Sequence, residues 1–196
     1  MSKMSKDIID RYGSFTDFAR TFCFKNQKKF CAAATRCICG HAPSFSRIDM
    51  AYGKGAASAC IYPQLVDLGE FCGCKDKMGV MQCKQLSQVI VSNFSFLKIT
   101  EFMLFLWWFK SGKYGRFYGS VDPLVISSAL RDFLQDRYSI IESEKTRHSE
   151  KERAQSRENA ISYEQWLAMK GDRPEDHPVL TMLFMSKGKN GGEAKK

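Results

Sequence analysis

The sequence lacks an apolar run long enough to cross a membrane. Its longest continuous apolar stretch is "FMLFLWWF", the eight residues 102–109, whereas a membrane-spanning helix needs about 20. The first residues, "MSKMSKDIIDRYG", also lack the apolar stretch of a secretory signal. We therefore expect a cytoplasmic protein without a membrane partner, in which residues 102–109 form a buried helix.

The motifs that mark common enzyme classes are also missing. The sequence has no glycine-rich phosphate loop, zinc-protease helix motif or nucleophile elbow. Nucleophilic catalysis needs a base beside a Cys or Ser, and only His41, His148 and His177 are present. His148 lies in a charged stretch and His177 in a linker, so only His41 has cysteines nearby in sequence. We therefore predict that the protein is not an enzyme.

Cysteine is absent after residue 83, although residues 23–83 contain all eight cysteines of the chain. Without a secretory signal, free thiols or metal ligands are favoured over disulfides. "CICGH" and "CGC" place Cys37, Cys39, Cys72 and Cys74 in two Cys-x-Cys pairs, and structural zinc usually takes four ligands from two short pairs. Cys-x-Cys closes around one ion less readily than Cys-x-x-Cys, and cysteines also serve as small core side chains. We predict no metal or other cofactor, with well under one zinc per chain, and keep zinc at these four residues as the alternative.

Acidic residues are scarce in the first third of the chain. Residues 1–60 contain ten Lys or Arg against four Asp or Glu, residues 61–130 seven against five, and residues 131–196 thirteen against twelve. Most of the net charge of +9 therefore belongs to the N-terminal third. A basic surface attracts polyanions, chiefly nucleic acids, although such a charge can also serve solubility alone.

Helical periodicity dominates the sequence, and no segment predicts a convincing strand. The apolar spacing in "SFTDFARTF" predicts one helix, Ser44 or Ser46 begins another that contains Phe45, Ile48 and Tyr52, and residues 78–94 form an amphipathic third. Gly53 and Gly55 interrupt the pattern, and Pro63 is expected in the first turn of a new helix or at a kink. The stretch 23–43 has no clear pattern.

Two further helices have distinct start signals. Thr100 is expected to cap a helix from Glu101 to about Lys110. Asp122-Pro123 pairs a capping carboxylate with proline at the first helical position, and we expect this helix to continue towards Lys170. Residues 142–160 contain almost no apolar side chain and mix both charge signs, which is typical of a solvated helix.

These patterns predict an all-α fold: a compact helical bundle-like domain with a long charged C-terminal helix. We expect a basic Cys-rich segment over 1–43, a helical core domain over 44–137 and an extended charged helix over 138–171. A linker and a basic disordered tail are expected over 172–196.

The glycine-rich stretch "KSGKYGRFYG" is the candidate binding site. Its cations could contact phosphates and its tyrosines could stack on bases, while its glycines allow close approach. The candidate nucleic-acid-binding residues are Lys110, Lys113, Tyr114, Arg116 and Tyr118.

The same stretch can also be a structural turn between two apolar helices. In that interpretation Phe117 and Tyr118 turn inward. We expect Phe117 and Val121 to be largely buried, and Lys110, Lys113, Tyr114 and Arg116 to share one surface patch.

Residues 46–137 resemble uncharacterised proteins from prophages and conjugative elements of Bacteroides-type bacteria. The similar segments are "SRIDMAYG", "LVDLGEF", "KDKM", the Leu/Phe-rich helix, "KSGKYGRFYGSVDP" and "LRDFLQDR". The resemblance implies a mobile-element context and no particular activity. A small helical domain followed by a long charged helix also looks like phage replication accessory proteins, including helicase loaders. The Cys-rich N-terminal residues depart from this pattern.

Together these features predict a non-enzymatic, nucleic-acid-associated accessory protein of a phage or mobile element, in DNA replication, with DNA favoured over RNA as its partner. The first alternative is a protein-interaction module in which residues 138–170 dock on a partner or on a second copy through Trp166, Leu167 and Met169. The second alternative is a small zinc-binding module.

Overall fold

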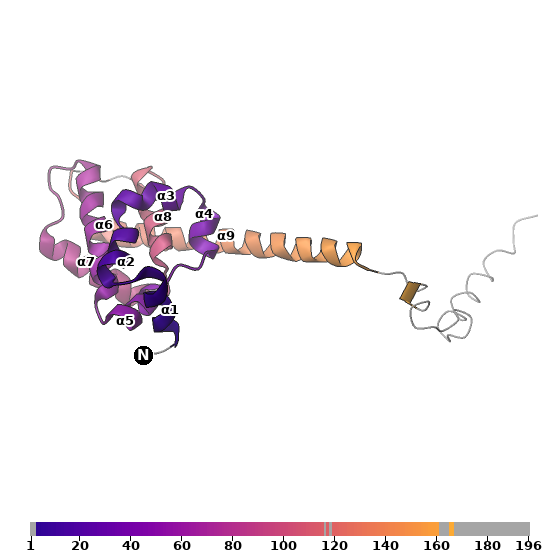
Figure 1. Cartoon of the computed structure of the whole chain (residues 1–196). Helices are drawn as coiled ribbons and strands as arrows, with labels where there is room; N and C mark the ends of the chain where they lie inside the picture. Colours follow the sequence, from indigo (N-terminus) through magenta and orange to yellow (C-terminus); the bar gives the residue numbers. More distant parts are fainter. Residues whose placement is uncertain (1–2, 116, 118, 161–164, 167–196) are drawn as a thin grey trace, which may run out of the picture. The chain divides into compact units, whose positions relative to one another are not determined.

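The computed structural model describes residues 3–115, 117, 119–160 and 165–166, and over these residues the protein is all-α, as predicted. No strand occurs in this part of the chain, which contains only two isolated bridges, Ser44 with Lys98 and Asp76 with Ser120. The helices, labelled in Figure 1, are α1 (Lys3–Tyr12), α2 (Phe15–Thr21), the 3₁₀ turn η1 (Phe24–Asn26), α3 (Gln27–Cys31), α4 (Ala34–Cys39), α5 (Phe45–Tyr52), α6 (Ala56–Cys72), α7 (Val80–Asn93), α8 (Ile99–Lys110) and α9 (Pro123–Glu158).

The chain divides into two units, residues 1–145 and residues 146–196. In the second unit, the side chains of residues 150–160 are all exposed, which agrees with the predicted solvated, charged helix. The expected continuation towards Lys170 is shorter in the structure, because α9 ends at Glu158. Residues 161–164 and 167–196 lie outside the described residues. Among those that are described, no helix is both long and apolar enough to span a membrane.

The core of the first unit is organised around α8. This helix is buried on nearly every face, from Ile99 to Leu106 and again at Phe109, as its uniformly apolar sequence predicts for a central helix. It contacts α3, α4 and α6. Side chains from both sides of residue 43, such as Phe18 and Phe45, share this core. The domain boundary at that residue stays a prediction.

The N-terminal helices differ in how clearly the sequence signals them. The predicted helix around "SFTDFARTF" is α2, and Ser14 caps it by accepting a hydrogen bond from the Asp17 N–H. The preceding α1 was not predicted, because it buries few apolar side chains, chiefly Ile8. It ends before Gly13, whose φ of +75° suits glycine.

The middle of the domain contains one correction. α5 begins after Ser44, one of the two predicted start residues. α6, however, starts at Ala56 and contains Pro63 in its interior. Of the two alternatives for Pro63, the first turn of a new helix was therefore wrong, and the kink stays a prediction. Apolar burial of Ile61, Leu65 and Leu68 stabilises the helix on both sides of the proline.

The start of α8 contains a second correction. Its N-cap is Lys98, whose backbone N–H donates to the Glu101 carboxylate at 2.8 Å. Thr100 lies inside the first turn and donates its hydroxyl to the carbonyl of Cys37 at 2.8 Å. The threonine therefore joins two helices instead of capping one. The start of α9 is as predicted, since the Leu124 N–H donates to the Asp122 carboxylate at 2.8 Å.

Candidate functional site

The predicted binding residues are Lys110, at the end of α8, and four residues of the loop between α8 and α9. Gly112 and Gly115 have φ values of +84° and +104°, which other residues rarely adopt, so the turn depends on glycine. At the end of the loop the Val121 N–H donates to the Asp76 carbonyl at 3.0 Å. Val121 is buried, as expected, and anchors the loop to the segment between α6 and α7.

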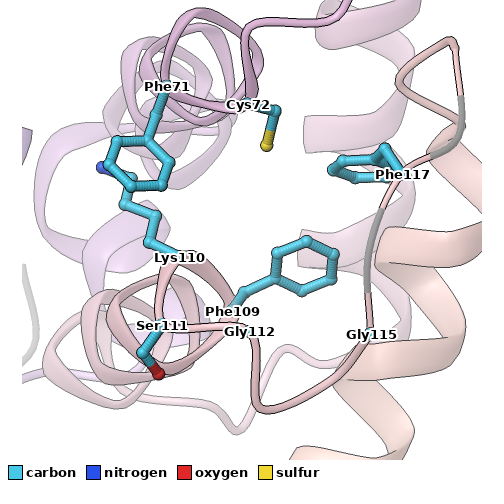
Figure 2. Close-up of a pocket in the computed structure, with 8 residues that line it drawn as sticks. All are labelled: Phe71, Cys72, Phe109, Lys110, Ser111, Gly112, Gly115 and Phe117. Atoms are coloured by element: carbon cyan, nitrogen blue, oxygen red, sulfur yellow. The ribbon is translucent and has the colours of Figure 1, made fainter.

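A cavity of 390 Å³ opens beside this loop, between the C-terminal ends of α6 and α8 (Figure 2). The rings of Phe71, Phe109 and Phe117 surround it, and the Cys72 thiol points into it (Figure 2). The Phe109 and Phe117 ring centroids are 5.2 Å apart. Phe117 is half-buried and not fully enclosed, whereas Phe71 is 61% exposed. The site therefore offers aromatic faces that solvent can reach.

Lys110 was expected to lie on the surface, but most of its side chain is buried. Its Nζ forms an ion pair with the Asp67 carboxylate and donates to the Gln27 side chain at 3.0 Å, and only 12% of its side chain is exposed. Asp67 was interpreted as a solvated helix position, but it is the partner of this lysine. A buried cation requires such a partner, because water no longer solvates its charge.

Lys113 and Tyr114 both engage Asp136 on α9. The Lys113 Nζ lies 2.8 Å from Asp136 Oδ2 and 3.8 Å from the Trp108 ring centroid, a cation–π contact. The Tyr114 hydroxyl donates to the same carboxylate oxygen at 2.6 Å. Tyr114 is half-buried against Phe105 and is not an exposed stacking platform. Lys113 is exposed, as expected.

The pKa values around Asp136 follow from this network. Burial raises the pKa of the Tyr114 hydroxyl, and the hydrogen bond to the Asp136 carboxylate raises it further. Burial also raises the pKa of Asp136, but the hydrogen bonds from Lys113 and Tyr114 outweigh it and the pKa lies below its ordinary value. Asp136 therefore carries its charge at neutral pH and holds the loop against α9.

The two remaining candidates, Arg116 and Tyr118, lie outside the described residues. Sequence reasoning missed the partners Phe71, Trp108 and Asp136. No local signal could have found Asp67 or Asp136, because their contacts with the loop lysines depend on how α6 and α9 pack against α8.

The four candidate zinc ligands differ in how exposed they are to solvent. Cys37 is buried and donates its thiol to the Phe30 carbonyl, while Cys39 is exposed. Cys72 and Cys74 are half-buried near the C-terminal end of α6. Among the residues that the structure describes, no three His, Cys, Asp or Glu side chains come together in a group that could hold a metal.

The comparisons with known proteins identify one family. Residues 77–175 match DUF6633, a family of unknown function. The match includes α7, α8, the loop and α9, and it begins after the Cys-rich segment. The comparison with curated proteins found no match, and the comparison with solved structures found none either.

Proposed function

The chain belongs to DUF6633, a family of unknown function, and from its own site we propose that it is a non-enzymatic, nucleic-acid-associated accessory protein of a phage or other mobile element. We place it in the cytoplasm and in DNA replication, with DNA favoured over RNA. The observation that carries the proposal is the aromatic cavity beside the loop, with the exposed cation Lys113 on that same loop.

A base from a single-stranded region fits the chemistry of this cavity. Aromatic rings stack on any base, so such binding tolerates sequence variation. Phe71, Phe109 and Phe117 line the cavity and supply the aromatic rings for such stacking. Lys113 can reach a phosphate by exchanging its Asp136 partner, since 42% of its side chain is exposed. Lys110 is expected to contribute less to phosphate binding than Lys113, because the Asp67 carboxylate already balances its charge.

The mobile-element context rests on the resemblance of residues 46–137 to prophage and conjugative-element proteins. The loop lies inside the part of the chain that matches DUF6633, whereas the Cys-rich segment lies outside it. This placement favours the loop over the cysteines as the functional feature of the family. Arg116 and Tyr118 remain candidate contacts on the same loop.

Oligonucleotide binding measured by fluorescence anisotropy tests the proposal. Wild-type protein should bind a single-stranded oligonucleotide, and its affinity should fall steeply between about 50 and 200 mM salt if several phosphates are contacted. Phe71→Ala should weaken binding by about tenfold or more, because stacking contributes about 1–3 kcal/mol per base. Phe96→Ala is the matched control, since Phe96 is also exposed and does not line the cavity.

The possible outcomes test the proposed function and the proposed binding site separately. Absence of binding to single-stranded DNA, duplex DNA and RNA at low salt would refute the proposed function. Equal affinities for the Phe71→Ala and Phe96→Ala proteins would leave nucleic-acid binding intact and remove the cavity from it.

The protein-interaction alternative predicts a different result in the same experiment. An apolar interface should respond little to salt, and a partner recovered by pull-down should survive nuclease treatment. Of the three side chains assigned to that interface, Leu167 and Met169 lie outside the described residues. The zinc-binding alternative predicts one zinc per chain that is lost when Cys37 and Cys72 are both replaced.

A further inference from the structure

Two adjoining cavities lie among the N-terminal helices, away from the residues that line the aromatic cavity. One, of 620 Å³, is lined by α1, the residues before α5 and α5 itself, and the other, of 310 Å³, reaches α2, α4 and the start of α8. They share Arg11, Tyr12 and His41. We name these two cavities together the N-terminal groove.

Four basic side chains from separate elements line the groove. Arg11 comes from α1, Arg36 from α4, Arg47 from α5 and His41 from the turn between α4 and α5. Among the described residues, none of these four side chains has an ion pair within 4.0 Å. In contrast, the loop cations Lys110 and Lys113 are both paired with carboxylates. The groove therefore gathers basic side chains without carboxylate ion pairs, unlike Lys110 and Lys113 beside the aromatic cavity.

Arg47, which lines the groove, has an unused hydrogen-bond donor. Its Nε is buried, and no acceptor in the described part of the chain takes its hydrogen. Buried polar groups normally have a partner, so an orphan donor calls for an explanation such as a missing ion. A phosphate oxygen would supply that acceptor, and guanidinium groups match phosphate with two parallel hydrogen bonds.

The turn that carries His41 is fixed before any ligand binds. The Lys98 Nζ donates to the carbonyls of Ile38 and Gly40 at 2.6 and 2.8 Å. The Ile99 N–H donates to the Pro43 carbonyl at 3.1 Å. These bonds attach the end of α4 and the following turn to the start of α8. Binding at a preformed site loses less conformational entropy, which favours affinity.

Acidic side chains limit how much negative charge the groove can accept. Asp7 and Asp10 line the larger cavity beside Arg11 and Arg47. Three arginines against these two carboxylates leave one positive charge. This balance suits one monoanionic group and disfavours a run of several phosphates in the same cavity.

We propose that the N-terminal groove binds one backbone phosphate of a nucleic acid, held by Arg11, Arg47, Arg36 and His41. The inference rests on the proposed function for the identity of its ligand, and the groove is a second contact, separate from the aromatic cavity. It assigns a purpose to the N-terminal excess of cations, which the loop does not explain.

The test compares two double variants of equal charge. Arg11→Gln with Arg47→Gln removes two groove cations, and Arg20→Gln with Lys54→Gln removes two exposed cations that do not line the groove. With a single-stranded oligonucleotide, the groove variant should lower the slope of log affinity against log salt by about one unit, the loss expected for one phosphate contact, and the control should lower it much less. Equal slopes for the two variants would overturn the proposal.

A second measurement keeps the two proposals distinguishable. Inorganic phosphate, titrated into the full-length protein up to tens of millimolar, should shift the NMR signal of the Arg47 Nε–H group. Absence of any shift would overturn the groove as a phosphate site. A shift in a protein that binds no oligonucleotide would refute the proposed function and the nucleic-acid ligand, while it would support phosphate recognition by the groove. If Arg47→Gln unfolds the protein, as circular dichroism would reveal, Arg11→Gln alone should still lower the salt slope, by less than about one unit, and Arg20→Gln alone should leave it unchanged.

Discussion

The ion pair between Glu101 and Arg137 is expected to be the most costly polar interaction to break in this domain. The Glu101 side chain is completely buried, and its two oxygens accept from the Lys98 N–H and the Arg137 Nε, each at 2.8 Å. Only 14% of the Arg137 side chain is exposed. The pair therefore joins the start of α8 to α9 with almost no access to water.

Replacing Arg137 with methionine should destabilise the fold by about 3–5 kcal/mol, because it leaves an unpaired carboxylate in the core. Glu101→Gln should cost less, about 1–3 kcal/mol, since a glutamine can still accept the Lys98 N–H, and the charge left unpaired is that of Arg137, which keeps 14% of its side chain exposed. The double variant should be more stable than Arg137→Met alone, because the second change removes the stranded charge.

Urea unfolding followed by far-UV circular dichroism measures these free energies from the midpoint and slope. Arg131→Met is the matched control, because Arg131 lies on the same helix and is exposed. It should change stability by no more than about 0.5 kcal/mol. The reasoning fails if Arg137→Met costs under about 1 kcal/mol, or if the double variant is less stable than the Arg137→Met protein.

Three further predictions follow from burial. Phe117→Ala should cost about 1–3 kcal/mol, less than the about 3–5 kcal/mol expected for the fully buried Phe105; equal urea midpoints for the two variants would contradict this. At about pH 8, a thiol reagent should label the exposed Cys39 in native protein but reach Cys60 only after unfolding, because burial raises the pKa of that thiol to about 12 and keeps it protonated. Hydrogen exchange over 146–158 should be fast, and strong protection there would instead show that this segment packs against another chain.

Local chemistry explains which parts of the fold the sequence predicted. Asp122 accepts a hydrogen bond from an N–H only two residues further along the chain, so its capping pattern was readable directly. The uniformly apolar segment 102–109 likewise predicted a buried helix. A helix that is apolar on every side is unfavourable in contact with water and is therefore expected in the core.

The errors occurred where a distant partner decides the outcome. Thr100 has the composition of a cap, but its hydroxyl bonds to Cys37, 63 residues earlier. Pro63 has the composition of a helix start, but burial of the residues around it sustains α6. In each case tertiary packing outweighs a local conformational preference of about 1–3 kcal/mol.

The candidate site shows the same division more sharply. The sequence by itself determined that the 110–123 stretch is a glycine-dependent turn between two apolar helices, and that the positive charge gathers in the N-terminal third. Only the tertiary structure decided how these cations are paired, because Asp67 and Asp136 approach Lys110 and Lys113 through helix packing. In contrast, α1, α4 and α5 place Arg11, Arg36 and Arg47 along the N-terminal groove, where none of the three has an ion pair within 4.0 Å in the described part of the chain, although Asp7 and Asp10 line the same groove. The physical reason is that composition fixes the number of charges, whereas their pairing depends on distances of a few ångströms that only the folded chain sets.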